Sequence, residues 1–580
     1  MIGGNGVGAP NSVFRGIAPK VRFYSWFGYN RQYGHVVNHS HGWPEDDKMD
    51  CDKCDDDHQM IFYYGEKVRS VDENIFRNWN LFTEGGDNLT KTTVTSAGNN
   101  GMNPQYGHQR GFHSVAEFKN IITVGAMNVL ANGVADFSSL GPTWDGRIKP
   151  DVMAQGDREG HVAATTVGKG VVAGYNHDFM CGTSASAPVV SGIVALMYQK
   201  FRETTGLPLE KLSMRNSTTK AMLIHSADDM TGFHYVVDVN SLTSVSVRYG
   251  KGPDFITGWG SVNAKGALDI IGGYDATTQK FERFREFEIY NGMVKKWTFN
   301  ISTGAKATKA RVTLVWDDAP PSIEEVSVEN FTKSKLVNDL DMYLVSPSGK
   351  RYYPWKLDTL PTYYMDWDGN VDSASGLLTR ISGLEKIALE DAEKGAHKCK
   401  KAGVGRFCFD HLNNVEVIDV EGRFENELLE TGEWQIVVEG YKVVKGNSTD
   451  GFAQVASIVS DFKLEEPACF KDDHPYMKNK SSSCVHELGD YLENYVIFDS
   501  RTYVASGDWI YLYDSADQLI GAYTGYELAG KTIAVKTKTL KVVLESNDDD
   551  QQGWGYAIDK VGHMPYDVLY PLLNNVRRKK

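Results

Sequence analysis

Two kinds of hydrophobic pattern alternate in the first half of the chain. Short β-branched or apolar runs at Thr92–Ser96 and 121–126 predict buried strands. Residues 184–201 are apolar on almost every side and begin with small residues, which predicts a buried helix in close contact with its neighbours. Because strands alternate with helices, we expect an α/β fold with a mostly parallel sheet over residues 1–275.

After residue 280 the pattern changes to a period of two. Apolar residues alternate over 312–316 and 340–344, and another strand-like run covers 434–438. These runs predict an antiparallel β-sandwich over residues 280–463, interrupted by a charged insertion at 384–401. Period-two runs also mark residues 465–580, where we expect a second small β-sandwich; they lie at 509–514, 532–536 and 540–545.

Composition agrees with three folded units. The chain has 580 residues, of which 41% are hydrophobic and 23% charged, as in core-forming proteins. No run of about 20 apolar residues occurs, so we predict no membrane span. The formal net charge of −14 argues against a nucleic-acid partner.

The seven cysteines are unevenly placed. Cys181 stands alone, and the other six form three local pairs: Cys51 with Cys54, Cys399 with Cys408, and Cys469 with Cys484. Short loops closed by paired cysteines favour an oxidising compartment, so we expect a secreted protein. Unpaired thiols in a cytosolic protein are the alternative. No basic and apolar leader follows Met1, which conflicts with secretion.

The Cys51 and Cys54 pair lies in a strongly acidic stretch. We expect a small loop closed by a disulfide at the surface. The alternative is a zinc site that also uses His58 and either His39 or His41.

The strongest chemical signal is Cys-Gly-Thr-Ser-Ala-Ser-Ala-Pro at residues 181–188, which leads into the predicted buried helix. A serine at a helix N-terminus has its own N–H and the positive end of the helix dipole beside it. Both stabilise a developing oxyanion. We therefore expect Ser184 to be a nucleophile, and an ordinary N-cap serine is the competing interpretation.

Two further segments carry a family resemblance. Thr-Ser-Ala-Gly-Asn-Asn-Gly occupies 95–101, and Phe-Ser-Ser-Leu-Gly-Pro-Thr occupies 137–143 ahead of Asp-Gly-Arg-Ile-Lys-Pro-Asp-Val at 145–152. In order and spacing, these segments and the serine motif resemble the subtilisin-like serine proteases (subtilases, peptidase family S8) across roughly residues 3–275. The resemblance implies that Ser184 is the nucleophile and that the Asn99 side-chain amide donates to the oxyanion.

Ser40-His41-Gly42 stands where the family places the strand that pairs with the substrate backbone. The resemblance therefore implies substrate-binding roles for Ser40 and Gly42, and His41 departs from the family pattern. The family also supplies an Asp from an Asp-Thr-Gly-like strand and a His from a His-Gly-Thr-His helix, and neither motif occurs in the 580 residues. We accordingly expect an N-terminally truncated chain, without its signal peptide and nearly inert alone.

The middle unit resembles the jelly-roll β domain of the oxidatively stable alkaline subtilases, through residues 314–320, 336–341 and 413–416. Asp339 and Asp341 lie two positions apart in a predicted strand and so share a face. Such paired carboxylates suit Ca²⁺. A polar outer strand face is the alternative.

The last unit resembles a CUB-like domain, through residues 508–514 and 544–548. That resemblance implies a protein partner and calcium ligands among Asp508, Asn547 and Asp548, against the alternative of a plain acidic turn. The function that we predict is serine endopeptidase activity on polypeptides, with no cofactor needed for the chemistry. The alternative is a pseudoprotease or adhesion protein that acts through its β modules.

Overall fold

The computed structural model describes most of the three predicted units. The described residues are 2, 17–18, 20, 36–40, 66–76, 92–99, 101, 117–128, 133–143, 145–157, 181–207, 214–237, 244–249, 251–277, 280–289, 291, 293–326, 333–357, 410–421, 428–448, 453–465, 481–488, 493–548, 553, 555–556 and 558–563. Cys51, Cys54, Gly42 and the predicted insertion at 384–401 lie outside them.

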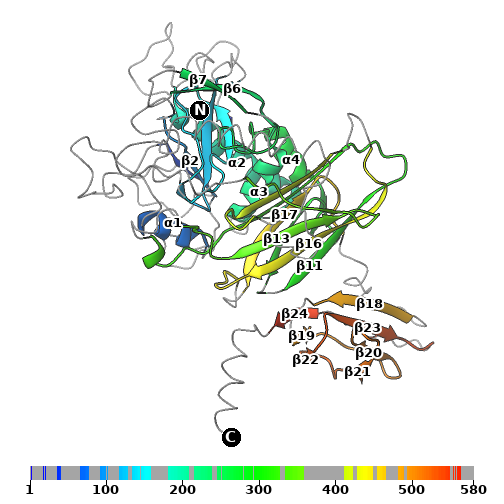
Figure 1. Cartoon of the computed structure of the whole chain (residues 1–580). Helices are drawn as coiled ribbons and strands as arrows, with labels where there is room; N and C mark the ends of the chain where they lie inside the picture. Colours follow the sequence, from blue (N-terminus) through cyan, green and yellow to red (C-terminus); the bar gives the residue numbers. More distant parts are fainter. Residues whose placement is uncertain are drawn as a thin grey trace.

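A five-stranded, mostly parallel sheet forms the first unit (Figure 1). Strands β1, β2, β3 and β5 run parallel, and β4 pairs antiparallel with β3. Their bounds are β1 Val36–His39, β2 Thr92–Ser96, β3 Ile122–Asn128, β4 Gly133–Val134 and β5 Val152–Gln155. The strands predicted at Thr92–Ser96 and 121–126 are thus confirmed.

Four helices accompany the sheet in the described residues: α1 Glu66–Phe76, α2 Thr183–Thr205, α3 Asn216–Ser226 and α4 Ala264–Gly272. Helix α2 is the predicted buried helix, and it packs on β1, β2, β3 and β5. It ends where Gly206 adopts a left-handed conformation with φ of 70° and donates its N–H to the Arg202 carbonyl. Two short hairpins complete the unit: β6 Gly232–Val237 with β7 Ser244–Tyr249, and β8 Tyr274–Asp275 with β9 Lys280–Phe281.

Two four-stranded antiparallel sheets follow, which we call the middle β unit. One has the order β10-β17-β12-β15, with bounds Phe284–Ile289, Gln454–Ser460, Lys309–Trp316 and Val415–Glu421. The other has the order β11-β16-β13-β14, with bounds Val294–Ile301, Gly432–Lys442, Asp339–Val345 and Arg351–Tyr352. A 3₁₀ turn, Glu324–Val326, lies between β12 and β13. The antiparallel sheets predicted here are confirmed.

The sheet that contains β15 is buried on both faces. Ile418 and Val420 pack in the core between the two sheets. Val415 and Val417, on the opposite face, pack in the core that the parallel sheet and α3 also form. Helix α3 therefore lies between the first unit and the middle β unit, in contact with β12 and β17 (Figure 1). The apolar area buried on both faces of this sheet stabilises the contact between the two units.

Seven more strands, counted over the described residues, form what we call the C-terminal β unit. Its four-stranded sheet has the order β18-β23-β20-β21, with bounds Ser481–Glu487, Thr539–Glu545, Trp509–Tyr513 and Leu519–Tyr523. The three-stranded sheet has the order β22-β19-β24, with bounds Thr532–Val535, Asn494–Phe498 and Ile558–His563. Cys484 on β18 is disulfide-bonded, and its predicted partner Cys469 lies outside the described residues. The CUB-like assignment stays a prediction.

His486 on β18 gives the C-terminal β unit an acid-sensitive element. Burial, with a smaller contribution from the positive charge of Lys296 on β11, lowers the pKa of His486 to about 4. An unfolded histidine has a pKa of about 6.5, so the unfolded chain binds the proton more tightly than the folded chain. The fold therefore has its full stability above pH 6.5, where His486 is neutral in both states, and loses stability as the pH falls towards 4. The difference between the folded and unfolded pKa values corresponds to about 3 kcal/mol of the free energy of unfolding.

We expect wild type to lose this free energy between pH 7 and pH 4, and His486→Gln to lose less over the same range. Urea unfolding at both pH values, followed by circular dichroism, measures the difference. An identical pH dependence in the two proteins would show that His486 does not control it.

Candidate active site

Ser184 lies in the first turn of α2. The helix begins at Thr183, directly after Gly182, whose φ of 121° favours glycine. The first four N–H groups of a helix have no partner within the helix, so the Ser184 N–H points out of the helix end. The Ser184 side chain is partly exposed, which leaves its hydroxyl accessible to a substrate.

Gly156, just after β5, allows the helix start to approach the sheet. The Gly182 N–H donates to the Gly156 carbonyl over 2.8 Å. A Cβ at Gly156 would lie 2.1 Å from the Ser186 hydroxyl oxygen and 2.9 Å from the Gly182 carbonyl oxygen. A side chain at position 156 would therefore push the Ser184 segment away from the end of the parallel strands.

Asn99 follows the end of β2 and reaches the same helix start. Its Oδ1 accepts hydrogen bonds from the Thr183 N–H at 2.8 Å and the Thr183 hydroxyl at 2.9 Å. Thr183 Oγ1 in turn accepts from the Gly98 N–H at 3.0 Å. These contacts occupy the amide oxygen. The Nδ2 donor of Asn99, an exposed residue, lies beside Gly182, 3.3 Å from where a Cβ on that glycine would be. The structure thus brings together the two motifs that predicted a nucleophile and an oxyanion donor.

Ser40 follows the end of β1, and its carbonyl accepts the Ser184 hydroxyl at 2.5 Å. Asn38 on β1 holds this strand end against α2, because its Oδ1 accepts from the Ser191 hydroxyl at 2.9 Å and its Nδ2 donates to the Ser40 hydroxyl at 2.9 Å. The carboxyl ends of β1, β2 and β5 therefore meet at the N-terminus of α2. Gly42, the other predicted substrate-binding residue, lies outside the described residues.

The Ser184 hydroxyl has no base beside it in the part of the chain that the structure describes. The hydrogen bond that it makes there goes to the Ser40 carbonyl. A peptide carbonyl does not take up a proton at neutral pH, so this arrangement holds the hydroxyl in place without activating it. Attack by Ser184 requires a general base to accept the hydroxyl proton.

A salt-bridged cluster under the sheet fixes the strand that leads to Gly156. Asp151 pairs with Lys149 at 2.5 Å and with Lys220 on α3 at 2.9 Å, and it accepts the Thr123 N–H at 2.7 Å. Burial raises the pKa of Asp151, but the two lysines outweigh that effect and lower it. Asp151 is therefore ionised and joins β3, β5 and α3.

Thr183 positions Asn99, and its removal should slow chemistry at Ser184. Thr183→Val deletes the hydroxyl that contacts Asn99 Oδ1 and the Gly98 N–H. We expect about a tenfold loss in the rate of Ser184 phosphonylation by a fluorophosphonate, with Thr183→Ser restoring the rate. An equal rate in the valine variant would show that the Thr183 hydroxyl does not hold the donor.

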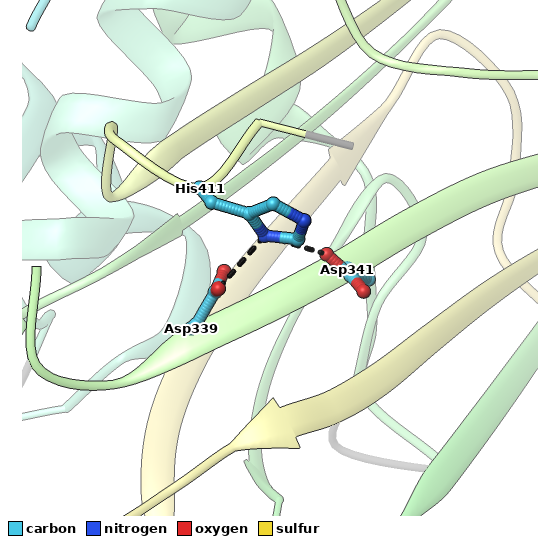
Figure 2. Close-up of side chains that lie close together, drawn as sticks. All are labelled: Asp339, Asp341 and His411. Carbon is cyan, nitrogen blue, oxygen red and sulfur yellow. Dashed lines mark hydrogen bonds and ion pairs between the residues drawn. The ribbon is translucent and has the colours of Figure 1, made fainter. Parts of the chain in front are cut away.

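The structure gathers one group of possible metal ligands among the described residues. Asp339 and Asp341 on β13 face His411, which precedes β15 (Figure 2). His411 Nδ1 lies 2.8 Å from Asp339 Oδ2 and 3.7 Å from Asp341 Oδ1. The two aspartates therefore lie on one side of the strand, as their spacing predicted, and calcium binding here stays a prediction.

Sequence reasoning missed His411. It precedes the quoted segment at 413–416 by two positions, and that proximity was the available signal.

The calcium ligands predicted in the C-terminal β unit are less closely grouped. Asp508 is fully buried, and its Oδ1 accepts the Asn547 N–H at 2.8 Å. Asp548 is exposed. Among the described residues, no third acidic group, histidine or cysteine joins these two aspartates in a possible metal site. A calcium site at Asp508 and Asp548 stays a prediction.

A comparison with known protein families agrees with the geometry of the site. The model of the subtilase family, peptidase S8, matches residues 13–260. This range includes Ser40, Asn99 and Ser184, the three residues that meet at the start of α2. Residues 13–260 form a subtilase domain.

Curated relatives share this subtilase domain over part of their length. The chain is 26% identical over 251 residues to the serine protease/ABC transporter B family protein tagB of Dictyostelium discoideum, covering 37% of this chain and 13% of that protein. It is 35% identical over 136 residues to the serine protease AprX of Bacillus subtilis, covering 22% of this chain and 29% of that protein. The chain thus spans well under two thirds of the length of these relatives.

Solved structures of serine proteases also match. A lanthipeptide protease matches with 21% identity and a TM-score of 0.27, over 41% of this chain and 61% of its own. The serine protease of Aeromonas sobria matches with 14% identity and a TM-score of 0.27, over 74% of this chain and 71% of its own. Among the described helices, none combines the length and apolar character that crossing a bilayer requires.

Proposed function

We propose that the subtilase domain is a serine endopeptidase domain that cleaves polypeptides through an acyl-enzyme on Ser184. The observation that supports this proposal most directly is the anchoring of Asn99 at the start of α2. Thr183 holds the amide oxygen at 2.8 and 2.9 Å, which leaves the amide nitrogen and the Ser184 N–H free to donate on the outer side of the helix end.

In this mechanism the Ser184 oxygen attacks the scissile carbonyl carbon. The Ser184 hydroxyl proton passes to a base and then to the leaving amine, so the C–N bond breaks as the acyl-enzyme forms. Water then hydrolyses the ester by the reverse sequence of proton transfers. The negative charge on the former carbonyl oxygen is stabilised by the Asn99 amide and the Ser184 N–H, beside the positive end of the α2 dipole.

We propose that the base is a histidine oriented by an aspartate, and that neither comes from a motif present in these 580 residues. No Asp-Thr-Gly or His-Gly-Thr-His segment occurs in them. The 580 residues alone should therefore retain only the acceleration due to oxyanion stabilisation and binding, about 10³–10⁴-fold over water.

Hydrolysis of a denatured protein substrate tests the proposal. Protein expressed from the complete native gene should cleave the substrate, and Ser184→Ala should abolish cleavage. Ser186→Ala, two positions along the same helix, is the matched control and should retain activity. Absence of cleavage by the wild-type protein, or cleavage that survives Ser184→Ala, would refute the proposal and favour the pseudoprotease or adhesion function.

We propose further that the protein is secreted and that the C-terminal β unit is a CUB-like module that binds a protein partner. The disulfide at Cys484 supports an oxidising compartment. Trp509 and Leu519 are exposed on the four-stranded sheet of that unit, with 39% and 57% of their surface accessible, and provide apolar contact area. Immunoblotting of culture medium against cell lysate tests secretion, and retention in the lysate would contradict it.

A further inference from the structure

We infer that Asp339, Asp341 and His411 form a binding site for a zinc-class divalent cation, with Glu416 beside it. The predicted calcium pair is part of this site, but the imidazole changes the cation that the site suits. The inference is independent of the proposed protease activity, because it concerns the middle β unit.

The donor atoms have the spacing that one ion requires. The three ligand atoms all lie within 4.8 Å of one another, and His411 Nδ1 lies 2.8 and 3.7 Å from the two carboxylate oxygens. Donors that are each about 2.1 Å from one zinc ion lie about 3 to 4 Å apart. Small side-chain adjustments therefore suffice for one ion to contact all three side chains, which Figure 2 shows close together.

Buried carboxylate oxygen atoms without a hydrogen bond are available to a cation. Asp339 is 7% exposed and Glu416 is fully buried, yet Asp339 Oδ1 and Glu416 Oε1 have no hydrogen-bond partner. A buried carboxylate oxygen without a partner destabilises the fold, because it has lost its hydration and gained no hydrogen bond in return. A cation bound by Asp339 would remove that penalty for its carboxylate.

The position of Glu416 follows from the fold. Glu416 is two and four positions before Ile418 and Val420 on β15, so its side chain points to the same face as theirs. That face lies between the two sheets of the middle β unit. Its Oε2 accepts the N–H of Met342, the residue after Asp341, at 2.7 Å. The carboxylates of Asp339, Asp341 and Asp410 lie near enough to interact electrostatically with Glu416. This excess of negative charge favours a cation.

The imidazole selects among divalent cations. Ca²⁺ and Mg²⁺ prefer sites made of oxygen ligands alone, whereas imidazole nitrogen suits Zn²⁺ and related ions. His411 is 33% exposed, while the two aspartate side chains are 9% and 3% exposed, so an ion can enter from solvent on the imidazole side. In the ion-free form the Nδ1 proton bridges to Asp339, and a bound ion takes its place.

The site adjoins a loop that contacts the subtilase domain. Asn413, two residues after His411, accepts the Ile148 N–H at 2.8 Å, and Asn414 donates to Asn120 Oδ1 at 3.1 Å. Binding at His411 therefore fixes the first residues of a segment that docks on the subtilase domain. A bound ion should stabilise the contact between the two units.

Equilibrium dialysis of the full chain against Zn²⁺ tests the inference, after treatment with a chelator and with metal content measured by mass spectrometry. Wild type should bind one additional Zn²⁺ relative to Asp341→Asn, and His411→Ala should weaken that binding at least tenfold. Asp517→Asn, which changes an exposed acid of the C-terminal β unit, should bind as wild type does.

Three results would overturn the inference. Equal Zn²⁺ binding by wild type and Asp341→Asn would show that these residues do not hold the ion. Undiminished binding by His411→Ala would exclude the imidazole as a ligand. Tighter binding of Ca²⁺ than of Zn²⁺ would show that the site is a calcium site with oxygen ligands, as the two aspartates alone predicted. Circular dichroism of each variant confirms that the chain is folded.

Discussion

Replacing Lys119 with methionine is expected to remove about 3–5 kcal/mol of the free energy of unfolding, the range found when one partner of a buried ion pair is removed. Lys119 Nζ pairs with Asp318 at 2.6 Å, and both side chains are fully buried. The same ammonium donates to the carbonyls of Ala319 and Lys335. Methionine fills the volume but leaves the Asp318 carboxylate without its cation.

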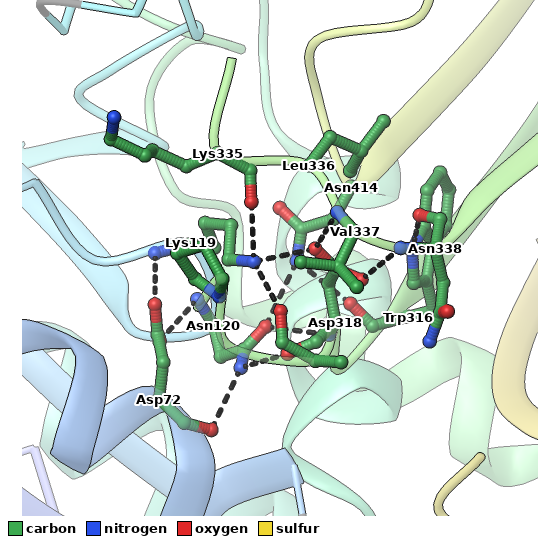
Figure 3. A network of polar contacts seen from close by, with 12 residues as sticks. Asp72, Lys119, Asn120, Trp316, Asp318, Lys335, Leu336, Val337, Asn338 and Asn414 are labelled. Carbon is green, nitrogen blue, oxygen red and sulfur yellow. Dashed lines mark hydrogen bonds and ion pairs between the residues drawn. The ribbon is translucent and has the colours of Figure 1, made fainter. Parts of the chain in front are cut away.

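This ion pair is the centre of a network that joins α1 to the segments 119–120, 318–319 and 335–338 (Figure 3). Asp318 accepts the N–H groups of Val337 and Asn338 at 3.0 and 2.8 Å. On the other side, Asp72 of α1 accepts the N–H groups of Lys119 and Asn120, each at 3.0 Å. Because one network includes the subtilase domain and the middle β unit, we expect the two units to unfold together.

Urea denaturation of wild type and Lys119→Met measures the loss. The matched control is Lys265→Met, since Lys265 makes an ion pair with Asp269 while remaining 86% exposed. An exposed helical pair contributes about 0.3–0.5 kcal/mol, so that control should change stability little. A loss below about 1 kcal/mol for Lys119→Met would contradict the linkage that we describe.

The second large effect concerns Asn99. Asn99→Ala removes the amide donor beside Ser184 and should slow cleavage by about 10²–10³-fold in kcat, the loss found in subtilisin when its oxyanion asparagine is removed. The KM should change little, because the donor acts on charge that develops only in the transition state. Peptide hydrolysis by protein expressed from the complete native gene measures both constants.

Asn263→Ala is a suitable control for this substitution. Asn263 caps α4 through its side chain, which accepts the Gly266 N–H at 2.8 Å, so its loss affects a helix end elsewhere in the subtilase domain. It should leave kcat unchanged. If Asn99→Ala raised KM and left kcat intact, Asn99 would bind substrate and would not stabilise the oxyanion.

Local patterns in the sequence were sufficient to predict much of the subtilase domain. The β-branched run at Thr92–Ser96 and the apolar run from Ser184 each form the predicted element. The resemblance of their segments to the subtilase motifs implied that Asn99 and Ser184 act at one site, and the structure places Asn99 against the start of the helix that carries Ser184.

Contacts between distant segments could not be predicted in this way. Lys119 and Asp318 are 199 positions apart, and neither local pattern distinguishes a buried charge from an exposed one. Glu416 illustrates the same limit. A charged residue in an alternating strand predicts an outward-facing side chain, yet both faces of its sheet are buried, so Glu416 lies between the sheets.

The most direct test of the central claim is to identify the residue that a fluorophosphonate modifies in protein expressed from the complete native gene. Mass spectrometry of the digested adduct should locate the phosphonyl group on Ser184. An adduct on another residue, or a folded protein from the complete gene that does not react, would contradict the assignment of Ser184 as the nucleophile.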